Sequence, residues 1–265
     1  MSIKNINDFK FFKESNTSIS VITCYDFSTA KIINETGIDA ILVGDSLGMV
    51  FSGHKSTIPV TLDNMIYHSQ AVRRGAPSKF IITDLPFMSY QVSPEQALNS
   101  CGRILKETGT NSVKLEGGRD FAETVRALVK ASIPVMGHIG LTPQSIHKIG
   151  GYTVQGRDEE KRLAMIEDAV ALEEAGAFSI VLEMVPETLA KEISEKISIP
   201  TIGIGAGRYC NGQVLVVNDM LGMDDGFKPK FLKKYASLSS IMKSAIDQYD
   251  SEVKSGSFPE EKNCY

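Results

Sequence analysis

The chain has 265 residues, 42% of them hydrophobic and 23% charged, with a formal net charge of −4 and a pI of about 5.7. This composition is typical of a globular protein with a sizeable core, and its slight acidity argues against a surface for nucleic acid or anionic membranes. The four cysteines have no C-x-x-C spacing, which argues against a zinc finger, a redox dithiol or a disulfide framework, so we expect reduced thiols.

Eight short apolar runs follow one another along the chain. They read SISVITCYD (Ser18–Asp26), AILVGDS, KFIITDLP, NSVKLEGG, IPVMGHIG, SIVLEMVP, PTIGIGAG and QVLVVNDML (Gln213–Leu221). Each is a short stretch rich in Ile and Val that stops at a turn signal, a pattern typical of buried parallel strands.

Helical patterns lie between most of these runs. The predicted helices cover 28–35, 62–74, 93–109, a segment opened by Asp120 and Glu123, 159–174, 186–196 and 230–254. The start at Ser93 has the clearest signal, with serine as N-cap, Pro94 at the first helical position and Gln96 closing a capping box. Gly109 favours the end of the same helix.

Strands that alternate with helices indicate right-handed parallel crossovers. Eight such units in about 250 residues predict one (β/α)₈ TIM barrel domain over 1–265, with its active site at the C-terminal ends of the strands. The alternative is an open doubly wound sheet. The turn CYDFST after the first run has no glycine for a phosphate, and GIGAG departs from G-x-G-x-x-G at Arg208, so the barrel is favoured.

The start of the chain and its apolar runs bear on location. MSIKNINDFKFFKESN is polar and lacks the apolar core of a signal peptide. No run approaches the roughly 20 apolar residues that span a bilayer. We therefore expect a cytoplasmic protein.

Acidic side chains end three of the runs: Asp45, Asp84 and Glu116. The ends of parallel barrel strands meet at one rim, so we expect these carboxylates within reach of one cation. Donors that supply only oxygen favour Mg²⁺ over zinc. Each carboxylate could instead cap the following helix, an alternative that three acids at successive strand ends disfavour.

Further candidates stand on the same runs. Lys114 precedes Glu116 by two residues, so both side chains point to one side of a strand, and the lysine could hold a substrate carboxylate or form a structural ion pair. His138 ends its strand, and two interpretations remain: it is a residue of the site, or it is a core histidine whose hydrogen bonds are satisfied. Glu183 lies among apolar residues, which suits it to proton transfer near neutral pH, whereas His68 is expected to be structural. A metal with a lysine and an acid–base residue suggests enolate chemistry on an α-keto acid.

Two long segments, 47–61 and 139–158, follow strand ends and are rich in Gly, Thr, Pro and Ser. Long loops in these positions are typical of binding loops or lids. We therefore expect both to border the site.

Several motifs together resemble one known family, ketopantoate hydroxymethyltransferase. They are VGDSLGMV, VTLDNMIYHSQAVRRGAP, DLPFMSY, VKLEGG, GHIGLTPQS, GGYTVQGR, LEMVPE and GIGAG, in this order, and the resemblance runs from about Ile19 to Pro259. It implies a (β/α)₈ barrel that transfers a hydroxymethyl group from 5,10-methylenetetrahydrofolate to 3-methyl-2-oxobutanoate (α-ketoisovalerate). The product is 2-dehydropantoate (ketopantoate), made through a Mg²⁺-stabilised enolate in pantothenate and coenzyme A synthesis.

The resemblance also implies roles for single residues. Mg²⁺ is bound by Asp45 and Asp84, with Glu116 completing its environment directly or through water. The keto acid contacts Asp45, Asp84, Ser46, Lys114 and His138, of which Lys114 holds its carboxylate, and Glu183 is the catalytic acid–base. Members of the family usually form large homo-oligomers, commonly decamers.

Three positions depart from the family pattern: Lys55 replaces a usual acid, Asn218 a common histidine and Asn211 a frequent aspartate. They affect loop details and folate affinity rather than the proposed metal or substrate contacts. The alternatives are another Mg²⁺-dependent keto-acid lyase or mutase of the phosphoenolpyruvate/pyruvate barrel type, or a barrel that has lost catalysis and serves as a scaffold.

Overall fold

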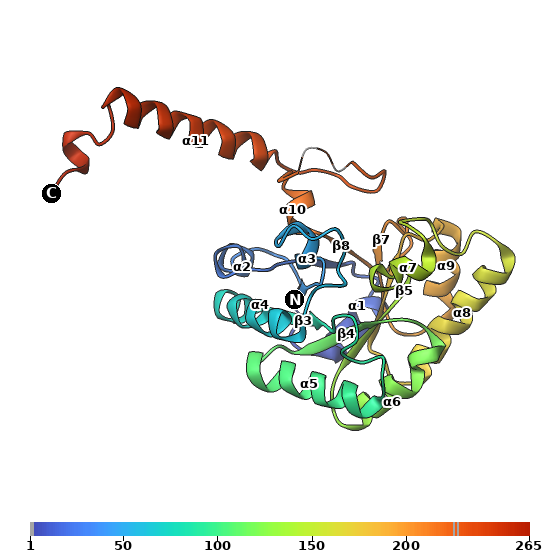
Figure 1. The fold of residues 1–265 in the computed structure, drawn as a ribbon. Helices are drawn as coiled ribbons and strands as arrows, with labels where there is room; N and C mark the ends of the chain where they lie inside the picture. Colours follow the sequence, from blue (N-terminus) through green and yellow to red (C-terminus); the bar gives the residue numbers. More distant parts are fainter. Residues whose placement is uncertain (1–2, 225, 227) are drawn as a thin grey trace. The chain divides into compact units, whose positions relative to one another are not determined.

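The computed structural model describes residues 3–224, 226 and 228–265, which divide into two compact units with the boundary after Val216. The first unit holds a closed barrel of eight parallel strands, paired in sequence order and closed by β8 against β1 (Figure 1). The predicted (β/α)₈ TIM barrel is confirmed. The prediction that a single domain covers residues 1–265 stays a prediction.

The strands of the barrel are short and lie close to the predicted runs. They are β1 (Ile19–Thr23), β2 (Ala40–Val43), β3 (Phe80–Asp84), β4 (Ser112–Glu116), β5 (Val135–Gly140), β6 (Ser179–Glu183), β7 (Thr201–Ile204) and β8 (Gly212–Leu215). The last run was predicted too long, because the Asn218–Asp219 pair breaks its apolar pattern and a short helix begins at Val217.

The helices of the first unit are α1 (Ile6–Glu14), α2 (Phe27–Asn34), α3 (Leu47–Val50), α4 (Leu62–Gly75), α5 (Pro94–Thr108), α6 (Ala122–Lys130), α7 (Ile146–Ile149), α8 (Glu159–Glu174) and α9 (Glu187–Lys196), with 3₁₀ turns η1 (Arg119–Phe121) and η2 (Pro143–Ser145). The second unit holds α10 (Val217–Met220), α11 (Leu238–Ser255) and η3 (Glu261–Asn263). The helix predicted over 230–254 thus begins later, after Ser237. In the described part of the chain, no helix is both long and apolar enough to cross a membrane.

The start of α5 agrees with the predicted cap in part. The Ser93 side chain accepts a hydrogen bond from the backbone N–H of Gln96, and Pro94 stands at the first helical position. The Gln96 side chain, however, accepts from the backbone N–H of Val92 rather than from Ser93, so the capping box is not closed. The helix ends as predicted at Gly109, in the left-handed conformation that favours glycine.

The helix α1 was not predicted, because its flanking residues are polar. It buries Phe9 and Phe12, and the Phe9 ring meets those of Phe80 and Phe178 edge to face, with centroids 5.2 and 5.0 Å apart. Phe80 begins β3 and Phe178 precedes β6, so α1 covers the N-terminal ends of the strands.

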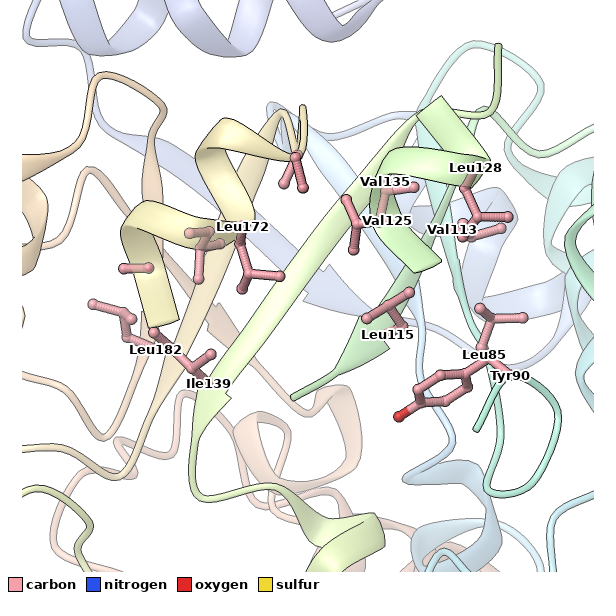
Figure 2. Close-up of a cluster of buried hydrophobic side chains, with 14 of the residues drawn as sticks. Leu85, Tyr90, Val113, Leu115, Val125, Leu128, Val135, Ile139, Leu172 and Leu182 are labelled. Carbon is pink, nitrogen blue, oxygen red and sulfur yellow. The ribbon is translucent and has the colours of Figure 1, made fainter. Parts of the chain in front are cut away.

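On β5 and β6, alternate residues enter two separate hydrophobic clusters, and each other strand contributes to one of the two. One, which includes Ile82 of β3 and Val181 of β6, lies inside the barrel. The other includes Val113 and Leu115 of β4 and packs against α6 and α8 (Figure 2). This alternation decides which strand residues face the barrel interior.

Candidate active site

The barrel directs the predicted side chains inward at the C-terminal ends of its strands. On β4, Val113 and Leu115 face the helices, so Lys114 and Glu116 face the interior. The same alternation turns Asp84, His138 and Glu183 inward on β3, β5 and β6. Backbone register then sets their neighbours: Asp84 pairs with Lys114, and Glu116 pairs with His138. Five predicted side chains therefore meet at one rim.

Lys114 is the central cation of this cluster. Its Nζ lies 3.1 Å from Asp84 Oδ1 and 3.2 Å from His138 Nδ1, and the lysine and aspartate side chains are each only 4% exposed. Burial opposes the charged form of Lys114, but the charges of Asp84, Glu116 and Asp45 outweigh it and raise the pKa of the lysine. Lys114 therefore stays protonated at neutral pH.

His138 lies between two carboxylates. Its Nδ1 is 3.4 Å from Glu116 Oε1, and its Nε2 is 3.2 Å from Glu183 Oε2. Burial and the charge of Lys114 oppose protonation, yet the two carboxylates raise the pKa of His138 to about 9. His138 is therefore part of the buried rim cluster, and its role as a site residue stays a prediction.

The acids differ in their surroundings. Burial, together with the charges of Glu116 and Asp84, raises the pKa of Asp45 well above its usual range. Burial also raises the pKa of Asp84, against the charge of Lys114. For Glu116 burial acts in the same direction, but the contact with His138 and the charges of His138 and Lys114 lower its pKa. Glu183 differs in exposure, since 19% of its side chain is accessible.

Asp45 and Ser46 come from the turn after β2. The backbone N–H of Asp45 donates to Asp84 Oδ2 at 3.1 Å, which links the ends of β2 and β3. The Ser46 hydroxyl lies 2.8 Å from the hydroxyl of Tyr25, a buried residue after β1. His68 is buried on α4, and its Nδ1 contacts the Tyr25 carbonyl oxygen at 2.6 Å, as expected of a structural histidine.

The two long loops predicted to border the site are joined to each other. The first contains α3, and the second contains η2 and α7. The Tyr152 hydroxyl in the second loop donates to Met49 Sδ on α3 at 3.3 Å. Both loops follow strand ends that carry site residues.

Two residues of the cluster were missed from the sequence. Gln144 of η2 donates to Asp45 and Glu116, and Tyr90, after β3, donates to the backbone carbonyl of Glu116 at 2.9 Å. Figure 2 labels Tyr90 beside Leu85 and Leu115. Gln144 lies within the motif GHIGLTPQS of a predicted binding loop, which was the available signal, but an uncharged amide in a loop has no periodic pattern that marks it as a site residue.

The departure at Asn211 has a structural role. Its side-chain Oδ1 accepts hydrogen bonds from the backbone N–H and the hydroxyl of Thr201, at 3.0 and 3.2 Å. Thr201 begins β7 and Asn211 directly precedes β8, so the contact joins neighbouring strands of the barrel. An aspartate could accept the same two bonds.

A parallel barrel with a buried cluster of acids, a lysine and a histidine at its C-terminal rim defines a TIM-barrel enzyme for a small polar substrate. Comparison with known proteins gives the family. The family model of ketopantoate hydroxymethyltransferase matches residues 3–261. The chain belongs to the ketopantoate hydroxymethyltransferase family and is an enzyme of that kind.

Curated relatives match along nearly the whole chain. The 3-methyl-2-oxobutanoate hydroxymethyltransferase of Leptospira interrogans is 58% identical over 259 residues, which cover 97% of this chain and 98% of the relative. The enzyme of the same name from Clostridium beijerinckii is 54% identical over 257 residues, covering 97% and 94%.

Solved structures share the fold at low sequence identity. A phosphonopyruvate hydrolase is similar with a TM-score of 0.64 and 11% identity, over 98% of this chain and 90% of that one. A 2,3-dimethylmalate lyase of the PEP mutase/isocitrate lyase superfamily gives 0.63 and 15%, over 100% and 90%. At these identities the likeness extends to the barrel alone.

Proposed function

We propose that the enzyme transfers a hydroxymethyl group from 5,10-methylenetetrahydrofolate to 3-methyl-2-oxobutanoate and so forms 2-dehydropantoate, a step of pantothenate synthesis. The names of the relatives support the acceptor and the product. The observation that carries the proposal is the charge of the rim, where four carboxylates face two groups able to carry positive charge, Lys114 and His138. Such a cluster calls for a further cation and suits proton transfer beside it.

We propose Mg²⁺ as that cation, with Asp45 and Asp84 as ligands. Both supply only oxygen, and Asp84 Oδ1 is fully buried with no hydrogen bond beyond its ion pair with Lys114. Among residues 3–224, 226 and 228–265, no three His, Cys, Asp or Glu side chains are grouped so that they could hold a metal by themselves. Mg²⁺ usually keeps several waters and needs only one or two carboxylates, so Glu116 would act through water. When bound, the ion would polarise the keto oxygen of the substrate.

The remaining side chains would hold the keto acid. Lys114 is charged and buried, so its ammonium group would bind the substrate carboxylate as a charge-assisted hydrogen bond donor. The Ser46 hydroxyl, held by Tyr25, would donate to the same acid. Together they would orient C3 of the substrate, the carbon that gains the one-carbon unit.

Glu183 would be the acid–base residue. It is the acid of the rim that is partly exposed, and it contacts His138 rather than Lys114. The carboxylate would take the proton from C3, and the neighbouring imidazole of His138 would keep it in place and stabilise its charge.

We also propose a homo-oligomer, with the decamer of the family as the expected form. On α11, apolar side chains recur at helical spacing and are exposed: Ile241, Met242, Ile246, Tyr249 and Val253. Contacts between copies of the chain would cover them. The mass in solution, by light scattering, tests this against a monomer of 28.9 kDa.

Turnover with both substrates, with and without EDTA, tests the proposed reaction. We expect 2-dehydropantoate only when the folate and Mg²⁺ are both present. In D₂O with Mg²⁺ and no folate, NMR should detect exchange of the C3 proton of 3-methyl-2-oxobutanoate. Absence of exchange in folded, Mg²⁺-loaded protein would contradict the mechanism, and turnover of the keto acid without folate would favour a lyase or mutase.

A further inference from the structure

One uncharged side chain, Gln144, joins three strand ends of the rim. It lies in η2 after β5 and is only 5% exposed, although it belongs to a long loop. A buried amide is costly unless its donors and acceptors are paired. The partners of Gln144 therefore indicate why this position is buried.

The nitrogen end of the side chain faces the acids. Its Nε2 donates to Asp45 Oδ2 at 2.9 Å and to the Leu85 carbonyl oxygen at 2.8 Å. The backbone N–H of the same residue donates to Glu116 Oε2 at 3.0 Å. One residue thus binds two of the rim carboxylates and the chain directly after Asp84.

The oxygen end faces away from the acids. Gln144 Oε1 accepts from Gln91 Nε2 at 3.1 Å and lies at the same distance from the Tyr90 hydroxyl, whose one proton is shared between this oxygen and the Glu116 carbonyl. Because both ends of the amide are occupied, its orientation is set, with the NH₂ group toward Asp45. One oxygen of Asp45, Oδ2, is held in this way.

We propose that Gln144 is a positioning residue whose side chain holds Asp45 in the orientation that binds the divalent cation, while its backbone N–H supports Glu116. The inference rests on the proposed function, because the cation belongs to it. An amide suits this place chemically. It donates to a carboxylate without adding charge to a rim that already has four acids, and a lysine here would compete with the cation.

The change Gln144→Met tests the proposal, because methionine keeps the length of the side chain and removes its hydrogen bonds. Mg²⁺ binding to EDTA-treated protein is measured by isothermal titration calorimetry. Loss of a side chain that orients metal ligands costs about 10–100-fold in affinity, so we expect the Mg²⁺ Kd to rise by that factor. Gln155→Met is the matched control, since Gln155 lies in the same loop and its side chain donates only to Thr153. Its Kd should equal that of the wild type.

The outcomes separate the inference from the function on which it rests. Wild-type protein that binds no Mg²⁺ would overturn the proposed metal site together with this inference. If the wild-type protein binds Mg²⁺ and folded Gln144→Met binds it with the same Kd, the inference alone is overturned. A residue with a merely structural role would lower the thermal midpoint when replaced, without weakening Mg²⁺ binding. If Gln144→Met does not fold, Gln144→Asn is measured in the same way, since its shorter amide cannot reach Asp45 and Leu85 together.

Discussion

At the scale of single residues, the acids of the rim differ in what holds them. Asp45 and Glu116 accept hydrogen bonds from Gln144, and Asp84 pairs with Lys114. Glu183 contacts His138 and keeps part of its side chain accessible. Asp45, Asp84 and Glu116 are thus held by donors within the rim, whereas the partly accessible Glu183 is the acid that we propose to meet the substrate proton.

The change Glu183→Gln separates proton transfer from metal binding. Loss of a general base costs at least about 100-fold in rate, so C3 exchange in D₂O should fall by that factor. The Kd for Mg²⁺ should not change, because Glu183 pairs with His138 and not with Asp45 or Asp84. Glu187→Gln on α9 is the control, since Glu187 pairs with Arg208 and not with His138. Exchange at the wild-type rate in Glu183→Gln would remove this residue from catalysis.

The cysteines predict a simple labelling pattern. Burial raises the pKa of Cys101 to about 12 and those of Cys24 and Cys210 to about 11, so at pH 8 these thiols stay protonated. Cys264 is exposed. Brief treatment of the folded protein with iodoacetamide at pH 8 should therefore label Cys264 first, which peptide mass spectrometry can measure. Early labelling of Cys101 would mean that its surroundings open readily.

The residues predicted from sequence are those whose position follows from strand periodicity. Asp84, Glu116 and Glu183 each end an apolar run, and a parallel barrel brings such ends together whatever the details of packing. Gln144 and Tyr90 could not be found in this way. Gln144 contacts Glu116 across 28 residues of chain, and Tyr90 contacts it across 26. Such contacts depend on the path of the loops, which leaves no periodic pattern in the sequence.

At the scale of elements, the strand order determines the chemistry of the rim. β3, β4, β5 and β6 are neighbours, so acid, lysine, histidine and acid follow one another around the barrel. At the junction of β5 and β6 the two backbones approach closely. Gly140 ends β5 with a φ of +96° and pairs with Glu183, and a Cβ there would clash with the Glu183 carbonyl oxygen.

The change Gly140→Ala should therefore disturb the strand that holds Glu183. Left-handed backbone and overpacking together cost about 3 kcal/mol in the free energy of unfolding, measured by urea denaturation. Gly150→Ala is the control: Gly150 also has positive φ, but a Cβ would meet nothing within 4 Å. Backbone strain alone should cost about 1–2 kcal/mol there. If the two variants lose the same free energy of unfolding, the clash with Glu183 is relieved by a local shift that costs nothing.

At the scale of the whole molecule, the rim buries three acids that share two groups able to carry positive charge. Asp45, Asp84 and Glu116 are buried beside Lys114 and His138, and burial with the neighbouring acids raises the pKa of Asp45, so its ionised form is costly without a further cation. Unpaired buried charge opposes folding, so the folded protein should be stabilised by the cation that the rim binds.

We expect added Mg²⁺ to raise the thermal midpoint of the wild-type protein. A ligand at 100 times its Kd stabilises the folded state by about 2.7 kcal/mol. Asp45→Asn should lose this response, while its midpoint without metal is equal or higher, because a negative charge beside Asp84 and Glu116 is removed. Asp120→Asn, the same change at an exposed site, should keep the full response to Mg²⁺. A midpoint indifferent to Mg²⁺ in all three proteins would contradict the proposed metal site.

The closure of the barrel also limits how copies of this chain can meet. Each of β1 to β8 is paired on both sides, so the barrel offers no open strand to which another chain could add its own. Sheet extension and strand exchange, common routes to aggregation, would first require the ring to break. An assembly of these barrels must therefore be made by side chains of helices and loops, and point substitutions there can alter assembly while leaving the barrel intact.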